Sequence, residues 1–193
     1  MHKPYILVAG NIGVGKTAVV EAISEELGLA AISSDHQDNP FLDRFYADRS
    51  RWAFQSQAFF LEQGLLQYRQ ILEQGGVQDQ SVHEHFLVFA HQLRDEGVLL
   101  PEEFEVLSGL YYGMQTNLPT PDLLVFLDAA PEVLLERAQQ QEGHEQHIDL
   151  SYLKALGARY QSFADSWLQS SVMKIDAEQE LEDIVEPILA QLS

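Results

Sequence analysis

A glycine-rich stretch near the start of the chain, residues 10–17, has the residue types and spacing to bind phosphate. It fills every defined position of the phosphate-loop pattern G-x-x-x-x-G-K-[ST]. In such a loop, backbone N–H groups converge on phosphate oxygens, the lysine brings a mobile positive charge and the threonine hydroxyl can ligate Mg²⁺. The pattern predicts a site for a nucleoside triphosphate with Mg²⁺, formed by Gly10, Asn11, Gly13, Gly15, Lys16 and Thr17.

The segments on either side of this loop are those that a phosphate loop requires. Residues 4–9 form an apolar run that predicts a buried strand, and residues 15–27 have helical spacing. A dinucleotide-binding fingerprint does not fit, because it needs its first two glycines two positions apart, whereas Gly10 and Gly13 are further apart.

The rest of the chain continues this alternation of strands and helices, which is typical of an α/β fold with a parallel sheet covered on both faces. We expect strands at residues 4–9, 29–33, 75–79, 122–127 and 171–175. We expect helices at residues 15–27, 40–47, 50–73, 83–95, 101–116, 131–141, 149–168 and 179–192. No linker or repeat divides the chain, so we predict a single P-loop domain over residues 1–193.

Composition limits the class of partner. The chain has 11 Lys and Arg against 30 Asp and Glu, for a net charge of −19, and this charge repels polymeric nucleic acid. It has no cysteine, which excludes disulfides and cysteine nucleophiles. Without a signal peptide or a long apolar segment, we expect a cytoplasmic protein that does not enter a membrane. A small anion with its own Mg²⁺ remains a feasible ligand, because the loop acts locally.

A second cluster, residues 39–57, is dense in aromatic, amide and arginine side chains and reads N-P-F-L-D-R-F-Y-A-D-R-S-R-W-A-F-Q-S-Q. Together with the phosphate loop it resembles the deoxynucleoside kinase family, in particular the bacterial deoxyadenosine and deoxyguanosine kinases. The resemblance continues through residues 78–81, 88–90, 121–128, 131–137 and 148–153, and so covers nearly the whole chain.

This resemblance implies a five-stranded parallel sheet and an enzyme that transfers the γ-phosphate of ATP to the 5′-hydroxyl of a deoxynucleoside, with a purine expected here. It also implies a homodimer. We expect the dimer contact on helices 50–73 and 83–95, which carry more apolar residues than one sheet face needs: Leu61, Leu65, Leu66, Tyr68, Leu72, Phe86, Leu87 and Leu93.

The resemblance also assigns roles to individual residues. Asp79 matches the family's acidic residue near the metal, so Asp79 and Thr17 would hold Mg²⁺, and Arg137 matches an arginine close to the phosphates. Gln57 would read the base edge. The remaining residues implied at the deoxynucleoside are Tyr46 and Glu145 at the sugar, Trp52 and Phe54 as walls of the base pocket, and His85 where the family completes base recognition.

Several positions depart from the family pattern. The family's arginine beside the transferred phosphate is Gln80 here, and the arginine and aspartate that complete base recognition are Gly64 and His85. With no side chain at Gly64, the base pocket could be larger or wetter than the family's and could accept a non-standard nucleoside. The lid, usually rich in arginine, keeps only Arg137 and continues as Gln141, Glu142, Gly143 and His144.

The family's catalytic carboxylate is also replaced. It stands five residues before the asparagine of N-P-F-L, which is Ser34 in this chain. A serine cannot take up the 5′-hydroxyl proton near neutral pH, so the local substitutes are Asp35 and Asp38. We predict Asp35, with Lys16 and Asp79, as the catalytic residues.

Two hypotheses follow from these departures. In the first, the chain is an active kinase that uses Asp35 and has a retuned pocket. In the second, it is a degenerate family member that binds nucleotide in a regulatory role without efficient phosphoryl transfer. The intact phosphate loop favours the enzyme.

Overall fold

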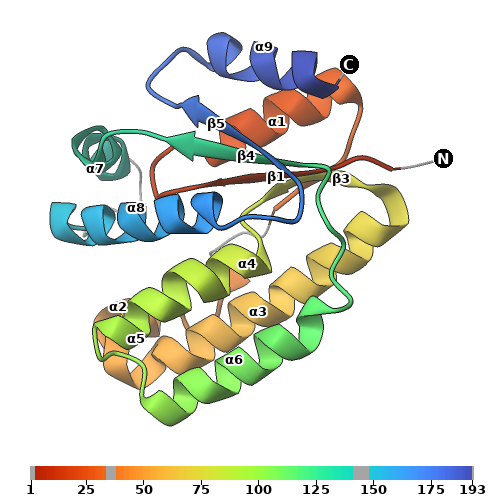
Figure 1. Cartoon of the computed structure of the whole chain (residues 1–193). Coiled ribbons are helices and arrows are strands. Elements are labelled where there is room, and N and C mark those ends of the chain that lie inside the picture. The colour runs from red at the N-terminus through yellow and green to blue at the C-terminus, as the bar shows by residue number, and fades with distance from the viewer. Residues whose placement is uncertain (1–2, 34–37, 141–147, 193) are drawn as a thin grey trace.

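The structure, a computed structural model, describes residues 3–33, 38–140 and 148–192. Five parallel strands form one sheet in the order β2-β3-β1-β4-β5 (Figure 1). The strands are β1 (Tyr5–Gly10), β2 (Ala31–Ile32), β3 (Gly76–Asp79), β4 (Leu123–Asp128) and β5 (Ser171–Asp176). This sheet confirms the predicted fold class, although β2 is shorter than expected.

Helices connect the strands and cover both faces of the sheet. They are α1 (Lys16–Leu27), α2 (Leu42–Ala47), α3 (Arg49–Gln74), α4 (Val82–Glu84), α5 (His91–Asp95), α6 (Pro101–Gln115), α7 (Pro131–Gln140), α8 (Leu150–Asp165) and α9 (Leu181–Leu192), with a π-helical turn, η2 (His85–Ala90), between α4 and α5. Among the described residues, no helix combines the length and the apolar character needed to cross a membrane.

The core has one layer on each side of the sheet, because successive residues of a strand point to opposite faces. Leu7 and Ala9 of β1 pack with α3, η2, α6 and α8, whereas Ile6 and Val8 pack with α1 and α9. Figure 1 shows α1 and α9 above the sheet, and α3, α6 and α8 below it.

The helix predicted over residues 83–95 is not regular. Its middle part, His85–Ala90, is a π-helix, and the N–H of His91 bonds the carbonyl of Phe86, five residues back. Such turns occur mostly inside α-helices and frequently lie at functional sites. Hydrophobic spacing cannot distinguish this single wide turn from an α-helix, so the prediction was wrong in helix type and right in position.

Parallel pairing brings the carboxyl ends of the strands to one edge of the sheet. Val8 of β1 is in register with Asp79 of β3, and Gly10 is in register with Leu127 of β4. Because β1 lies between β3 and β4, the loop after β1 opens at the edge where ligands of open α/β sheets collect.

Candidate functional site

The phosphate loop needs glycine at two positions for different reasons. Gly15, at the start of α1, has φ 95, a left-handed conformation that favours glycine. A Cβ on Gly13 would lie 2.8 Å from the carbonyl oxygen of Leu134, so α7 packs directly on the loop backbone. No side chain caps the amino end of α1. Its first-turn amides therefore suit an anion.

Lys16 and Asn11 hold the loop in its present shape. The Lys16 ammonium donates to the carbonyls of Gly10 at 2.9 Å and Asn11 at 3.2 Å, so it lies over the loop. The Asn11 amide donates to the carbonyl of Leu153 on α8 at 2.9 Å. The Asn11 side chain thus ties the loop to α8, while its backbone carbonyl accepts from Lys16.

The two predicted metal ligands lie together. The Thr17 hydroxyl donates to Asp79 Oδ2 at 2.7 Å, and Asp79 Oδ1 is buried with no hydrogen-bond partner among the described residues. Mg²⁺ is usually bound through one or two protein ligands together with substrate phosphates and water. A hydroxyl and a half-satisfied carboxylate beside a phosphate loop fit that ion.

Arg137 lies on the outer side of the phosphate loop. Its guanidinium donates to the carbonyl of Ala177, after β5, at 3.0 Å and to the carbonyl of Val14 at 3.4 Å. It therefore connects α7 to both the loop and the segment after β5. We call this group of residues, 10–17 with Asp79 and Arg137, the nucleotide side.

The turn after β3 contains a buried carboxyl group that the sequence interpretation missed. Gln80 has φ 58, and no other described residue except glycine has a positive φ. Glu84 Oε2 accepts from the backbone N–H of Ser81 at 2.8 Å and lies 3.3 Å from its hydroxyl. The spacing S-x-x-E is that of a capping box, and this signal could have identified Glu84.

Glu84 is completely buried. Burial raises the pKa of its carboxyl to about 7, while the positive charge of Lys16 lowers it and Asp79 raises it further. Lys16 and Asp79 are thus the charged groups that face Glu84, and both belong to the nucleotide side.

The two residues predicted to recognise the base, Gln57 and His85, lie on α3 and η2, and Phe60 connects these two elements. Gln57 and Phe60 are three residues apart, so they share a face of α3. The His85 ring stacks on the Phe60 ring at a centroid distance of 4.7 Å and an interplanar angle of 4°. Gln57 is 5% exposed, and its Oε1 has no hydrogen-bond partner in the part of the chain that the structure describes.

The other predicted wall residues have different surroundings. The ring of Trp52 lies 4.9 Å from the Arg44 guanidinium and 4.7 Å from that of Arg51, and it stacks on Phe41 at 5.9 Å. These contacts surround Trp52 with residues of its own region. Phe54 is half-buried and packs on the core.

Tyr46, predicted at the sugar, is 37% exposed and lies near Tyr152 of α8, whose pKa burial raises. The Arg49 guanidinium lies 5.3 Å above the Tyr152 ring. Because Arg49 also bonds Glu96 at 2.8 Å, this corner joins the beginning of α3, the end of α5 and α8. We call Tyr46, Gln57, Phe60 and His85 the acceptor side.

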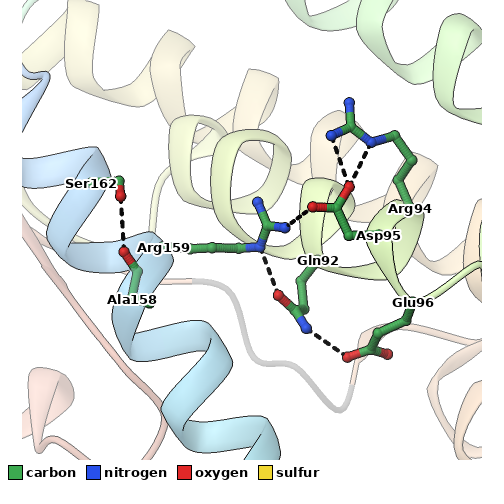
Figure 2. A network of polar contacts seen from close by, with 7 residues as sticks. All are labelled: Gln92, Arg94, Asp95, Glu96, Ala158, Arg159 and Ser162. Carbon is green, nitrogen blue, oxygen red and sulfur yellow. Dashed lines mark hydrogen bonds and ion pairs between the residues drawn. The ribbon is translucent and has the colours of Figure 1, made fainter.

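Polar contacts fix α8 against α5 beside this corner. Figure 2 shows Arg159 reaching from α8 to Gln92 and Asp95 on α5. Arg159 Nε donates to Gln92 Oε1 at 2.6 Å, and the Gln92 amide donates to Glu96 at 2.8 Å. These bonds therefore join α5 and α8, which are far apart in the sequence.

Comparison with known proteins gives the family. A family model described as "Deoxynucleoside kinase" matches residues 6–190. The chain belongs to this family. The "Deoxyadenosine/deoxycytidine kinase" of Bacillus subtilis (strain 168) is 31% identical to it over 179 residues, covering 90% of this chain and 82% of the relative. The "Deoxyguanosine kinase" of the same organism is 29% identical over 159 residues, covering 82% and 77%.

A solved structure shows the same fold. The deoxyadenosine kinase from M. mycoides with bound dCTP superposes with a TM-score of 0.87 at 20% identity, covering 97% of this chain and 98% of that chain. The five-stranded sheet is therefore that of the deoxynucleoside kinases, a P-loop NTPase fold.

The structure shows what occupies the space beside Gly64, one of the positions that depart from the family pattern. A Cβ on Gly64 of α3 would lie 2.9 Å from the Cβ of Val82 on α4. The space beside Gly64 is therefore filled, and the expectation of a larger or wetter pocket at this position was wrong. The sequence cannot show this, because the contact joins residues from two helices.

Two predicted site residues cannot be placed. Asp35 and Glu145 lie outside the described residues, as do Ser34 and the lid residues after Gln140. The roles proposed for them remain predictions from the sequence.

Proposed function

We propose that this deoxynucleoside kinase transfers the γ-phosphate of Mg²⁺-bound ATP to the 5′-hydroxyl of a purine deoxynucleoside. The observation that carries the proposal is the 2.7 Å bond between Thr17 and Asp79 at the edge of the sheet, beside an intact phosphate loop. The relatives bear the names of kinases, and no described contact favours a chain that binds nucleotide without transferring phosphate.

The residues of the nucleotide side suit phosphoryl transfer, which depends on positioning and on neutralising charge. The amides of residues 10–17 would hold the phosphates, and Lys16 would leave its carbonyl contacts to meet the β- and γ-phosphates. Mg²⁺, held by Thr17 and Asp79, would neutralise the charge that develops on the transferred group. Asp35 would accept the proton of the 5′-hydroxyl.

The acceptor side has side chains that suit a nucleobase, which is flat and has polar edges. The rings of His85 and Phe60 are buried and stack on each other, and Gln57 has a buried acceptor without a partner among the described residues. A base that donates a hydrogen bond to Gln57 would remove the cost of that unpaired oxygen. The purine preference rests on the two Bacillus subtilis relatives, whose names each include a purine deoxynucleoside.

The test is turnover on deoxyadenosine, deoxyguanosine, deoxycytidine and thymidine with ATP and Mg²⁺, followed by identification of the product. We expect a deoxynucleoside 5′-monophosphate, with kcat/KM higher for a purine. Higher kcat/KM for both pyrimidines would remove the purine preference alone. Absence of product with all four deoxynucleosides would remove the proposed function.

We also propose a homodimer, with a different second helix from the one predicted. Of the predicted contact residues on 83–95, Phe86 and Leu93 are buried in the core and Leu87 is half-buried. Exposed apolar side chains gather instead on α3 and α6, which pack side by side (Figure 1): Leu65, Leu66, Leu72, Val106, Leu110 and Tyr112. Light scattering should give a dimer mass, and Leu66→Glu with Leu110→Glu should give a monomer.

The partners that we propose are small molecules only. The net charge of −19 disfavours polymeric nucleic acid, which a nucleic-acid binding assay can check. A cytoplasmic location and a role in nucleotide salvage remain predictions.

A further inference from the structure

Glu84 is a buried carboxyl group, which is an unusual setting for a residue with a capping role. It accepts the Ser81 amide at the start of α4, a helix of three residues. On the outer helix α6, Glu103 makes the same kind of contact, to the amide of Leu100 at 3.0 Å, in an exposed setting. Burying a carboxyl group costs free energy that an exposed cap does not. The burial of Glu84 therefore calls for another explanation than helix initiation.

The contact of Glu84 fixes a turn that carries a candidate metal ligand. Asp79 ends β3, Gln80 follows with φ 58, and Ser81 then offers its amide to Glu84. A left-handed residue with a side chain persists only when its surroundings hold it. Glu84 supplies that restraint two residues after Asp79, whose Oδ2 meets Thr17.

The Tyr160 hydroxyl of α8 lies near Glu84. Burial raises the pKa of this hydroxyl, and the Glu84 carboxyl raises it further. Neither Glu84 Oε1 nor the Tyr160 hydroxyl has a hydrogen-bond partner among the described residues. The same helix also contacts the phosphate loop, because Asn11 bonds Leu153.

We propose that Glu84 is a positioning residue that holds the turn of residues 79–81, and thereby places the Asp79 carboxylate for the Mg²⁺ of the bound nucleotide. Glu84 does not touch substrate. It acts through the Ser81 amide. This inference rests on the proposed function, because that function assigns Asp79 to the metal.

The experiment measures ATP binding to the full chain by calorimetry, once with Mg²⁺ and once with EDTA. The ratio of the two dissociation constants is the magnesium advantage, which does not depend on turnover. Glu84→Leu removes the carboxyl group, whereas Glu84→Gln keeps its length and an oxygen that can accept from Ser81. Glu103→Leu is the matched control, since it removes the same kind of contact on α6.

We expect Glu84→Leu to lower the magnesium advantage at least about tenfold, as loss of an outer-shell partner of a metal ligand typically does. Glu84→Gln should stay within about threefold of the wild type, since its amide oxygen can replace the accepting carboxylate oxygen. Glu103→Leu should match the wild type. In turnover, Glu84→Leu should lower kcat while leaving KM for the deoxynucleoside unchanged.

Two results would overturn the inference. An unchanged magnesium advantage in Glu84→Leu would leave Glu84 with a structural role only, and an equal loss in Glu84→Gln would assign the effect to its charge. If Glu84→Leu does not fold, Glu84→Asp decides, because its shorter side chain moves the carboxylate away from the Ser81 amide. It should lower the advantage at least about threefold, and no change would refute the inference. A wild type without a magnesium advantage would remove the proposed function as well.

Discussion

The nucleotide side and the acceptor side are assembled in different ways. Most of the nucleotide side is one continuous stretch, residues 10–17, between a strand and a helix. The acceptor side takes Gln57 and Phe60 from α3 and His85 from η2. A continuous site keeps its geometry as long as its own residues are kept. A distributed site depends on packing between helices, so when one residue changes, neighbours from other helices fill the space.

The positions of Gly64 and His85 illustrate this dependence on packing. The resemblance predicts that Gly64 and His85 stand where the family has an arginine and an aspartate. In the structure, the space at Gly64 is occupied by Val82, and the His85 ring stacks on Phe60. Neighbours from other helices therefore fill the space at both positions.

The first prediction concerns Lys16 of the nucleotide side, where we expect the greatest loss of activity. Lys16→Ala should lower kcat about 10³-fold and weaken ATP binding, because it removes the charge that meets the β- and γ-phosphates. Steady-state kinetics and calorimetry measure the two effects. Lys154→Ala is the control, since Lys154 pairs with Glu132 at the surface at 2.9 Å. Activity that survives in Lys16→Ala would separate the phosphate loop from the reaction.

The second prediction concerns Asp35, whose change should affect turnover and leave ATP binding unchanged. Asp35→Asn should lower kcat at least about 10²-fold, because it removes the group predicted to accept the 5′-hydroxyl proton, and ATP affinity should stay unchanged. Asp38→Asn, the other local carboxylate, should retain turnover. If Asp38→Asn is the inactive variant, the roles of these two residues are reversed. If neither loses turnover, the base lies elsewhere.

The same contrast explains what could be predicted from the sequence. The strand and helix positions followed from apolar periodicity, and the phosphate loop from its spacing, because both are local properties. The filling of the space at Gly64 by Val82 and the π-turn at His85 depend on contacts between distant segments, so no local pattern shows them. Glu84 is intermediate, since its S-x-x-E spacing is local but its complete burial is not.

A pH experiment tests the buried helix next to the acceptor side. Burial lowers the pKa of His83 to about 4, and its ring is surrounded by the rings of Tyr68, Tyr111 and Trp167. Below pH 6.5 the unfolded chain binds a proton that the folded His83 does not, so stability falls as pH falls. Between pH 7 and pH 5 this contributes about 2 kcal/mol of lost stability.

The measurement is the free energy of unfolding in urea at both pH values. In His83→Gln, which keeps a hydrogen-bonding group beside Tyr111, the loss between pH 7 and pH 5 should be smaller than in the wild type by that amount. Glu84 has a raised pKa and acts in the opposite direction, but it is present in both proteins and cancels. Equal losses in the two proteins would show that His83 is not buried in its neutral form.

The last prediction concerns the contact between Gly64 and Val82, and its expected effect on stability is the smallest. Gly64→Ala places a Cβ 2.9 Å from that of Val82, and such overpacking costs about 1–3 kcal/mol, against a gain of about 1 kcal/mol in helix propensity. We expect a net destabilisation of about 1 kcal/mol in urea unfolding. Gly109→Ala, on α6 with open space at its Cβ, should instead stabilise. If Gly64→Ala stabilises as Gly109→Ala does, the space at Gly64 is open, and the acceptor side is roomier than its packing indicates.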